Sequence, residues 1–146
     1  MQKDYLQEIT VERPIDEAFA LFTPKGEEAW VPGWTPTYID PANGETREEM
    51  LFTTGDGDEA TYWTCLQWQP QDWHVRYLRL TPASRVSFVD VTCQPEGAGR
   101  TRVRVGYEMR ALSPEGQAYI SELSDDAFAD MIDEWTQLID RMASPA

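Results

Sequence analysis

The fold is decided by SPEGQAYISELSDDAFADMIDEWTQLIDRM, the stretch of sequence from residue 113 to residue 142. Its apolar side chains recur every three or four residues, which is the period of an α-helix that buries one side. At ~1.5 Å per residue, a continuous helix of this length would extend ~40 Å and would need a broad apolar surface beneath it. We therefore expect one long helix whose buried stripe consists of Ile120, Leu123, Ala127, Met131, Trp135, Leu138 and Met142.

The segment before this helix alternates between apolar and polar residues, which is the period of a β-strand. The clearest alternation runs from Thr101 to Leu112. Such a strand has one covered face and one wet face, as in an antiparallel sheet that is packed on one side only. The covered face would carry Thr101, Val103, Val105, Tyr107 and Met109, and the wet face Arg102, Arg104, Glu108 and Arg110.

Two short helices and several further strands are expected before this strand. Pro14 and the acidic residues after it indicate a short helix that ends before Pro24, and a second short helix fits residues 26–30. The predicted fold class is α+β, with a curved antiparallel sheet of about 6–7 strands wrapped around one long C-terminal helix, in a single domain over residues 1–146. The further strands are expected at residues 5–12, 37–40, 48–54, 60–69, 73–80 and 85–94.

The composition argues against several classes of partner. A formal net charge of −14 is unsuited to nucleic acid or to an anionic membrane surface, because both are bound by Lys and Arg. No apolar run approaches the ~20 residues of a membrane span, so we expect no membrane insertion and a cytoplasmic location. The single histidine, His74, and the spacing of the cysteines do not suit zinc, and we expect neither a metal nor a cofactor. The oligomeric state stays open, with a homodimer as one alternative.

Four segments carry a resemblance to a known family. They are ITVERPIDEAF (residues 9–19), WVPGW (30–34), GAGRTRV (97–103) and LSPEG (112–116). In this order, over nearly the whole chain, they resemble the START-like superfamily, also called Bet v 1-like, helix-grip or SRPBCC proteins, and its polyketide cyclase/dehydrase-like branch. The resemblance implies a sheet that curves around the long helix and a cavity between them for a lipid, hormone, polyketide or other apolar molecule.

The residues that line such a cavity are predicted from the strand alternation and the helix period. Aromatic rings make good walls for flat apolar ligands, and the chain has six tryptophans. The alternative interpretation is that the same rings only fill the core. The predicted ligand-binding residues are Trp30, Trp34, Tyr77, Phe88, Val105, Tyr107, Met109, Ala127, Met131 and Trp135.

Asp90 and Tyr107 are the candidate catalytic residues. If Phe88 points into the cavity, Asp90 points there too, and a carboxylate in an apolar pocket has a raised pKa. Tyr107 could then polarise a carbonyl, as enolising or cyclising enzymes require. In the rival register, Val89 and Val91 point inward and Asp90 lies in water. The sequence leaves both registers open.

Three functions follow from these patterns. The first is a binding protein that holds a small hydrophobic or amphipathic molecule in the cavity. The second is a polyketide cyclase or dehydrase-like enzyme that uses acid/base residues there. The third is a protein-interaction module, like the co-chaperone members of the superfamily, with a filled core and a functional outer surface. Its candidate surface residues are Arg76, Arg79, Arg102 and Arg104.

Overall fold

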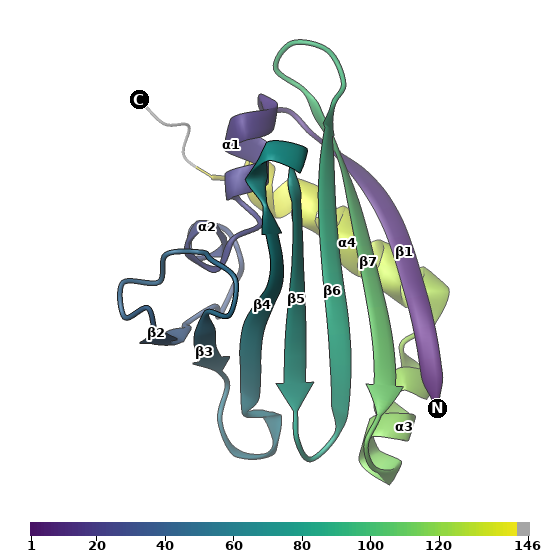
Figure 1. Cartoon of the computed structure of the whole chain (residues 1–146). Helices are drawn as coiled ribbons and strands as arrows, with labels where there is room; N and C mark the ends of the chain where they lie inside the picture. Colours follow the sequence, from purple (N-terminus) through teal and green to yellow (C-terminus); the bar gives the residue numbers. More distant parts are fainter. Residues whose placement is uncertain (143–146) are drawn as a thin grey trace.

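The computed structural model describes residues 1–142. Its main layer is a seven-stranded antiparallel sheet in the order β1-β7-β6-β5-β4-β3-β2 (Figure 1). Every strand from β3 to β7 therefore lies beside its neighbours in the sequence, as the short turns predict. The strands are β1 (Gln2–Val11), β2 (Thr37–Asp40), β3 (Leu51–Thr54), β4 (Thr61–Gln69), β5 (His74–Thr81), β6 (Arg85–Pro95) and β7 (Thr101–Ala111).

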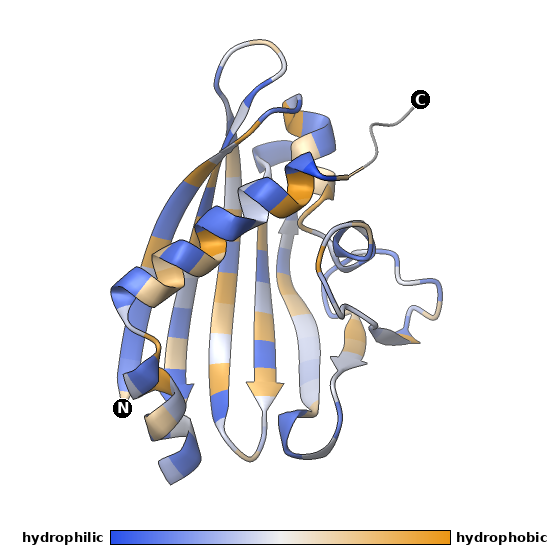
Figure 2. Ribbon diagram, turned by 180° about the vertical axis from the view of Figure 1, so that it is seen from behind, coloured by the Kyte–Doolittle hydropathy of each residue, from blue (hydrophilic) through white to orange (hydrophobic). Residues whose placement is uncertain are grey.

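The second layer consists of helices on one face of the sheet, here called the inner face. The last helix crosses this face diagonally (Figure 2). The predicted α+β class, the strand order and the two short helices after the first strand are confirmed, while the expected domain end at residue 146 lies outside the described residues. The helices are α1 (Ile15–Ala20), α2 (Pro24–Glu27), α3 (Pro114–Glu122) and α4 (Asp125–Asp140), with short 3-10 helices η1 (Gly57–Glu59) and η2 (Pro70–Asp72).

The prediction of one continuous C-terminal helix is wrong, because the helix breaks between α3 and α4. Leu123 leaves the helical conformation with φ −85° and ψ 86°, and Ser124 starts a new helix by accepting a hydrogen bond from the backbone N–H of Ala127 at 3.0 Å. Serine followed by two aspartates is a strong start signal, since the acids stabilise the positive end of the helix. The Tyr5 hydroxyl donates to the carbonyl of Leu123 at 2.8 Å, which satisfies an acceptor that the break leaves free.

The break also changes which side of α4 is buried. The buried residues of this helix are Phe128, Ile132 and Ile139, and Trp135 is half-buried beside them. Ala127, which the predicted stripe placed in the cavity, is exposed to solvent. The other predicted stripe residues of this helix, Met131, Trp135 and Leu138, are half-buried and pack against the core, so the centre of the buried face lies about one residue further along the chain than predicted.

The two faces of the sheet are clearly separated in β6 and β7. In β7, Val103, Val105 and Met109 are almost fully buried, which confirms the predicted alternation. In β6, Val89 and Val91 point to the inner face, so the placement of Phe88 in the cavity is wrong. Phe88 lies on the outer face, where the guanidinium of Arg76 is 4.9 Å from its ring centre. No helix within residues 1–142 is both long and apolar enough to cross a membrane.

Candidate functional site

A cavity of about 200 Å³ lies between the inner face of the sheet, α2 and α4. Its walls come mainly from strands β3 to β7, from the α2 region and from the C-terminal half of α4. Six of its thirteen lining residues are aromatic, and two charged side chains face the same space. The aromatic lining residues are Trp34, Phe52, Trp63, Tyr77, Tyr107 and Trp135.

The aromatic wall is held by ring stacking and by hydrogen bonds. The rings of Phe52 and Trp63 stack at a centroid distance of 5.4 Å, and Trp34 meets Trp63 edge-on at 5.5 Å. The indole N–H of Trp34 donates to the carbonyl of Pro24 at 2.9 Å. Ring pairs in these arrangements are favourable, and the indole bond fixes Trp34 to the start of α2. The wall is therefore fixed by contacts within the protein itself.

Arg79 brings a positive charge to the cavity. It lies two residues after Tyr77 in β5, so both side chains point to the inner face. Its guanidinium lies over the ring of Trp63, 5.3 Å from the centroid. Within residues 1–142 it forms no ion pair and no side-chain hydrogen bond, whereas the Tyr77 hydroxyl donates to the carbonyl of Phe22 at 2.9 Å. The Arg79 N–H groups are thus free to bind a ligand.

Glu27, the last residue of α2, brings a carboxyl group to the cavity. The short helix is fixed at its start, where the Thr23 hydroxyl accepts from the backbone N–H of Gly26 at 3.0 Å. Burial raises the pKa of Glu27 from 4.5 to about 8, and the positive charge of Arg79 opposes part of this rise. The side chain keeps some accessible surface because it lines the cavity.

Tyr107 supplies a hydroxyl group from β7. Burial is the main cause that raises its pKa to about 12, so the hydroxyl stays neutral at physiological pH. Its ring packs edge-on against Phe128 of α4 at 5.0 Å. The hydroxyl forms no hydrogen bond in the part of the chain that the structure describes. Glu27, Arg79 and Tyr107 therefore offer a carboxyl, a guanidinium and a phenol to one small space.

Some of the predicted ligand-binding residues line the cavity, and others belong to the core. Trp34, Tyr77, Tyr107 and Trp135 line the cavity, as described above. Trp30 lies behind this wall, edge-on to Trp135 at 5.5 Å, and its indole donates to the carbonyl of Leu21 at 2.8 Å. The residues that belong to the core without lining the cavity are Trp30, Val105, Met109 and the half-buried Met131.

Asp90 and Tyr107, the predicted catalytic pair, lie on opposite faces of the sheet. Asp90 points to the outer face of the sheet, as the rival register predicts. Its carboxylate forms an ion pair with Arg76 and lies 2.8 Å from Nε2 of His74. Arg76 also binds Glu108, 2.7 Å away. The structure thus places Asp90 in an ion-pair network on the outer face, separated from the cavity by the sheet itself.

Sequence reasoning missed Glu27 and misplaced Arg79. Arg79 was grouped with Arg76 as a surface residue, although three positions along a strand place two side chains on opposite faces. The alternation of the strand, counted from Tyr77, places Arg79 on the inner face. Glu27 gave no such signal, because a helix of four residues is too short to show a period.

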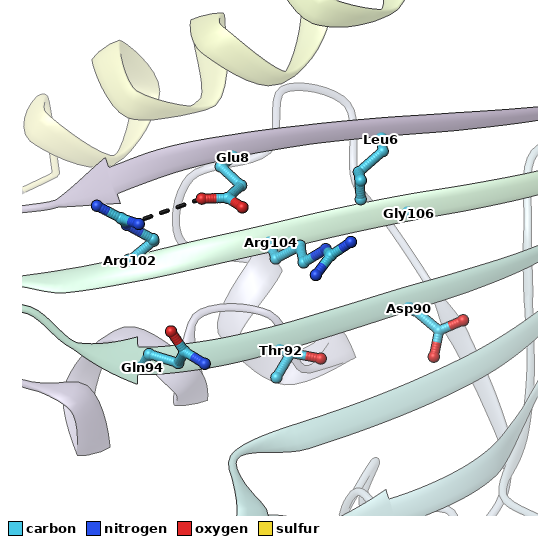
Figure 3. Close-up of a pocket in the computed structure, with 8 residues that line it drawn as sticks. All are labelled: Leu6, Glu8, Asp90, Thr92, Gln94, Arg102, Arg104 and Gly106. Atoms are coloured by element: carbon cyan, nitrogen blue, oxygen red, sulfur yellow. Dashed lines mark ion pairs between the residues drawn. The ribbon is translucent and has the colours of Figure 1, made fainter.

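A second hollow, of about 310 Å³, lies on the outer face over β1, β7 and β6 (Figure 3). It exists because Gly106 has no side chain in the middle of β7, beside Leu6 and Asp90. Its charged groups are partly paired, as between Arg102 and Glu8 at 3.7 Å. Exposed pairs of this kind contribute little binding energy, and the hollow has a single large apolar residue, Leu6. We therefore take the inner cavity as the candidate site.

No protein-family model matches the chain, and no curated protein matches its sequence. Solved structures do match. Norcoclaurine synthase from Thalictrum flavum, in complex with dopamine and hydroxybenzaldehyde, superimposes with a TM-score of 0.67 over 99% of this chain and 90% of its own, at 13% identity. The chain has the Bet v 1-like helix-grip fold.

Two further structures have the same helix-grip fold. The di-domain ARO/CYC protein BexL of the BE-7585A biosynthetic pathway matches 98% of this chain with 48% of its own, at 17% identity and a TM-score of 0.69. Protein MLL2253 from Mesorhizobium loti matches 97% of this chain with its full length, at 16% identity and a TM-score of 0.65. At these identities the similarity establishes the fold.

Proposed function

We propose that the protein binds a small amphipathic molecule, with an aromatic body and one polar group, in the inner cavity. One observation carries the proposal: aromatic walls that are fixed by contacts within the protein line a space into which unpaired polar groups point. A volume of about 200 Å³ is below the ~300 Å³ at which pockets for drug-sized ligands begin, so a ligand of one or two rings fits best.

The solved structures support this proposal through what they bind or are named for. Norcoclaurine synthase was solved with two small aromatic molecules, and BexL is described as an ARO/CYC protein. The alternative of a protein-interaction module expects a filled core. It is less favoured here because the cavity contains polar groups without partners, and because Arg79 points inward and not to the surface.

Filling the cavity should weaken binding. Val89 of β6 lines the cavity and Val86 of the same strand points outward, so Val89→Phe and Val86→Phe add the same ring on opposite faces. We expect Val89→Phe to weaken the binding of 2-naphthol at least ~10-fold, because a ring occupies the ligand's volume, and Val86→Phe to leave it unchanged. Binding is measured by the quenching of tryptophan fluorescence.

Native mass spectrometry of protein from its own host gives an independent reading. A bound mass that is present in the wild type, absent in Val89→Phe and lost on denaturation would identify the natural ligand class. If both variants bind 2-naphthol as the wild type does, the ligand does not lie in this cavity.

A second candidate function is acid/base catalysis in the same cavity. The observation in its favour is a carboxyl group with a pKa of about 8 close to an unbonded neutral phenol, since a catalytic pKa near the working pH is most effective. The exchange of the α-protons of 2-tetralone in heavy water, followed by NMR, tests it. Exchange that exceeds the buffer rate and is lost in Glu27→Gln supports catalysis, and exchange at the buffer rate excludes it for this ketone.

A further inference from the structure

The charges in the cavity do not balance at neutral pH. Among residues 1–142, Glu27 and Arg79 are the only charged side chains that line it. They are not within ion-pair distance of each other in the described structure. With its pKa near 8, the Glu27 carboxyl is mainly protonated at pH 7, while a guanidinium is always charged. Within residues 1–142, the cavity therefore holds one positive charge that no other side chain of its lining neutralises.

The groups around Glu27 keep its carboxyl protonated at neutral pH. The other titratable groups that interact with Glu27 are the phenols of Tyr38, Tyr77 and Tyr107, all on strands of the sheet. Burial raises the pKa of each phenol. All three are neutral at pH 7. In the described part of the chain, Arg79 is the only cation whose charge lowers the pKa of the Glu27 carboxyl, and its effect is smaller than that of burial.

The Arg79 guanidinium is placed to bind a planar anion. Its central carbon lies over the Trp63 ring, 5.3 Å from the centroid, and the residues that the structure describes form no ion pair or side-chain hydrogen bond with its N–H groups. Those N–H groups match the two oxygens of a carboxylate, and the bidentate pair is stronger and more directional than a neutral hydrogen bond. The neutral Tyr107 hydroxyl and the protonated Glu27 add donors from the same lining.

We propose that the ligand is an aromatic carboxylate whose rings lie between the tryptophans and whose carboxylate pairs with Arg79. This inference rests on the proposed function, because it assumes that the cavity binds a ligand. A carboxylate is favoured over a phosphate ester because a single guanidinium neutralises one negative charge and would leave the second charge of a phosphate buried and unpaired.

The first test compares a carboxylate with its neutral analogue by isothermal titration calorimetry at pH 7. The wild type should bind 1-naphthoate roughly 10- to 100-fold more tightly than 1-naphthamide, as expected for hydrogen bonds to a charged group. Arg79→Gln should remove this preference. Arg104→Gln, which removes the same charge from the exposed outer face, should retain it. Circular dichroism confirms that each variant is folded, and Arg79→Lys, which keeps the charge, should retain part of the preference.

The second test uses pH. As the pH rises from 7 to 9.5, Glu27 ionises beside the bound carboxylate, so the affinity for 1-naphthoate should fall while that for 1-naphthamide stays constant. In Glu27→Gln the side chain is neutral at every pH, and the affinity for 1-naphthoate should be independent of pH over this range.

The outcomes separate the two proposals. If the wild type binds naphthamide as tightly as naphthoate, the cavity binds ligands but the carboxylate assignment is wrong. If 1-naphthyl phosphate binds more tightly than naphthoate, the anion is a phosphate and the assignment is also wrong. If none of the three compounds binds, and 2-naphthol does not bind either, the proposed function falls and the inference falls with it.

Discussion

Replacing Glu27 by glutamine should make the protein more stable at alkaline pH. The pKa of this carboxyl is about 8 in the folded protein and 4.5 when it is exposed, so the unfolded chain releases its proton first as the pH rises. The wild type therefore loses stability between about pH 4.5 and pH 8, and this loss is complete above pH 8. Glutamine has no proton to lose and avoids the penalty.

The expected gain at pH 9 is ~2–4 kcal/mol, from ~1.4 kcal/mol per pKa unit after allowance for the water that reaches the side chain through the cavity. Urea unfolding of both proteins at pH 4.5, 7 and 9 measures it. The two curves should coincide at pH 4.5 and separate at pH 9. Glu45→Gln is the control, because it removes the same charge from an exposed loop. A variant that is no more stable than the wild type at pH 9 would show that Glu27 ionises normally.

Replacing Gly26 by alanine should destabilise the protein by ~2–4 kcal/mol, although alanine is normally the better helix former. A Cβ atom at position 26 would lie 1.9 Å from the carbonyl oxygen of Ala20 and 2.9 Å from the Cα of Leu21. Both are backbone atoms, so α2 itself must move away from the end of α1. The loss is measured as a lower urea midpoint with an unchanged slope.

Gly106→Ala is the matched control for this variant. Its Cβ would meet the carbonyl oxygen of Tyr5 at 3.7 Å, which is an ordinary contact, so stability should change by less than ~0.5 kcal/mol. Because Gly26 precedes Glu27, a shift of α2 also moves the cavity carboxyl, and Gly26→Ala should weaken the binding of 2-naphthol. Equal stability of the two alanine variants would show that α2 does not depend on this close approach.

The sheet could be predicted because its signal is local. In β7 every second residue from Val103 to Met109 is apolar, and the period of two alone decides which side chains share a face. The same rule applied from Tyr77 would have placed Arg79 beside the cavity. What the period does not decide is which of the two faces is covered, and Asp90 illustrates this. Its neighbours Val89 and Val91 are apolar, but so is Phe88, and both registers were open.

The order of the elements, the antiparallel sheet and the presence of an apolar C-terminal helix were thus determined by the sequence itself, since period, capping residues and turns act over a few residues. Tertiary structure decided the rest. Because a new helix begins after Ser124, α4 lies so that Phe128 and Ile132 are buried while Ala127 is exposed. Glu27 and Arg79 line the same cavity although they come from a four-residue helix and a distant strand. The charge state of that carboxyl depends on the burial that the assembled walls provide, and no local pattern encodes it.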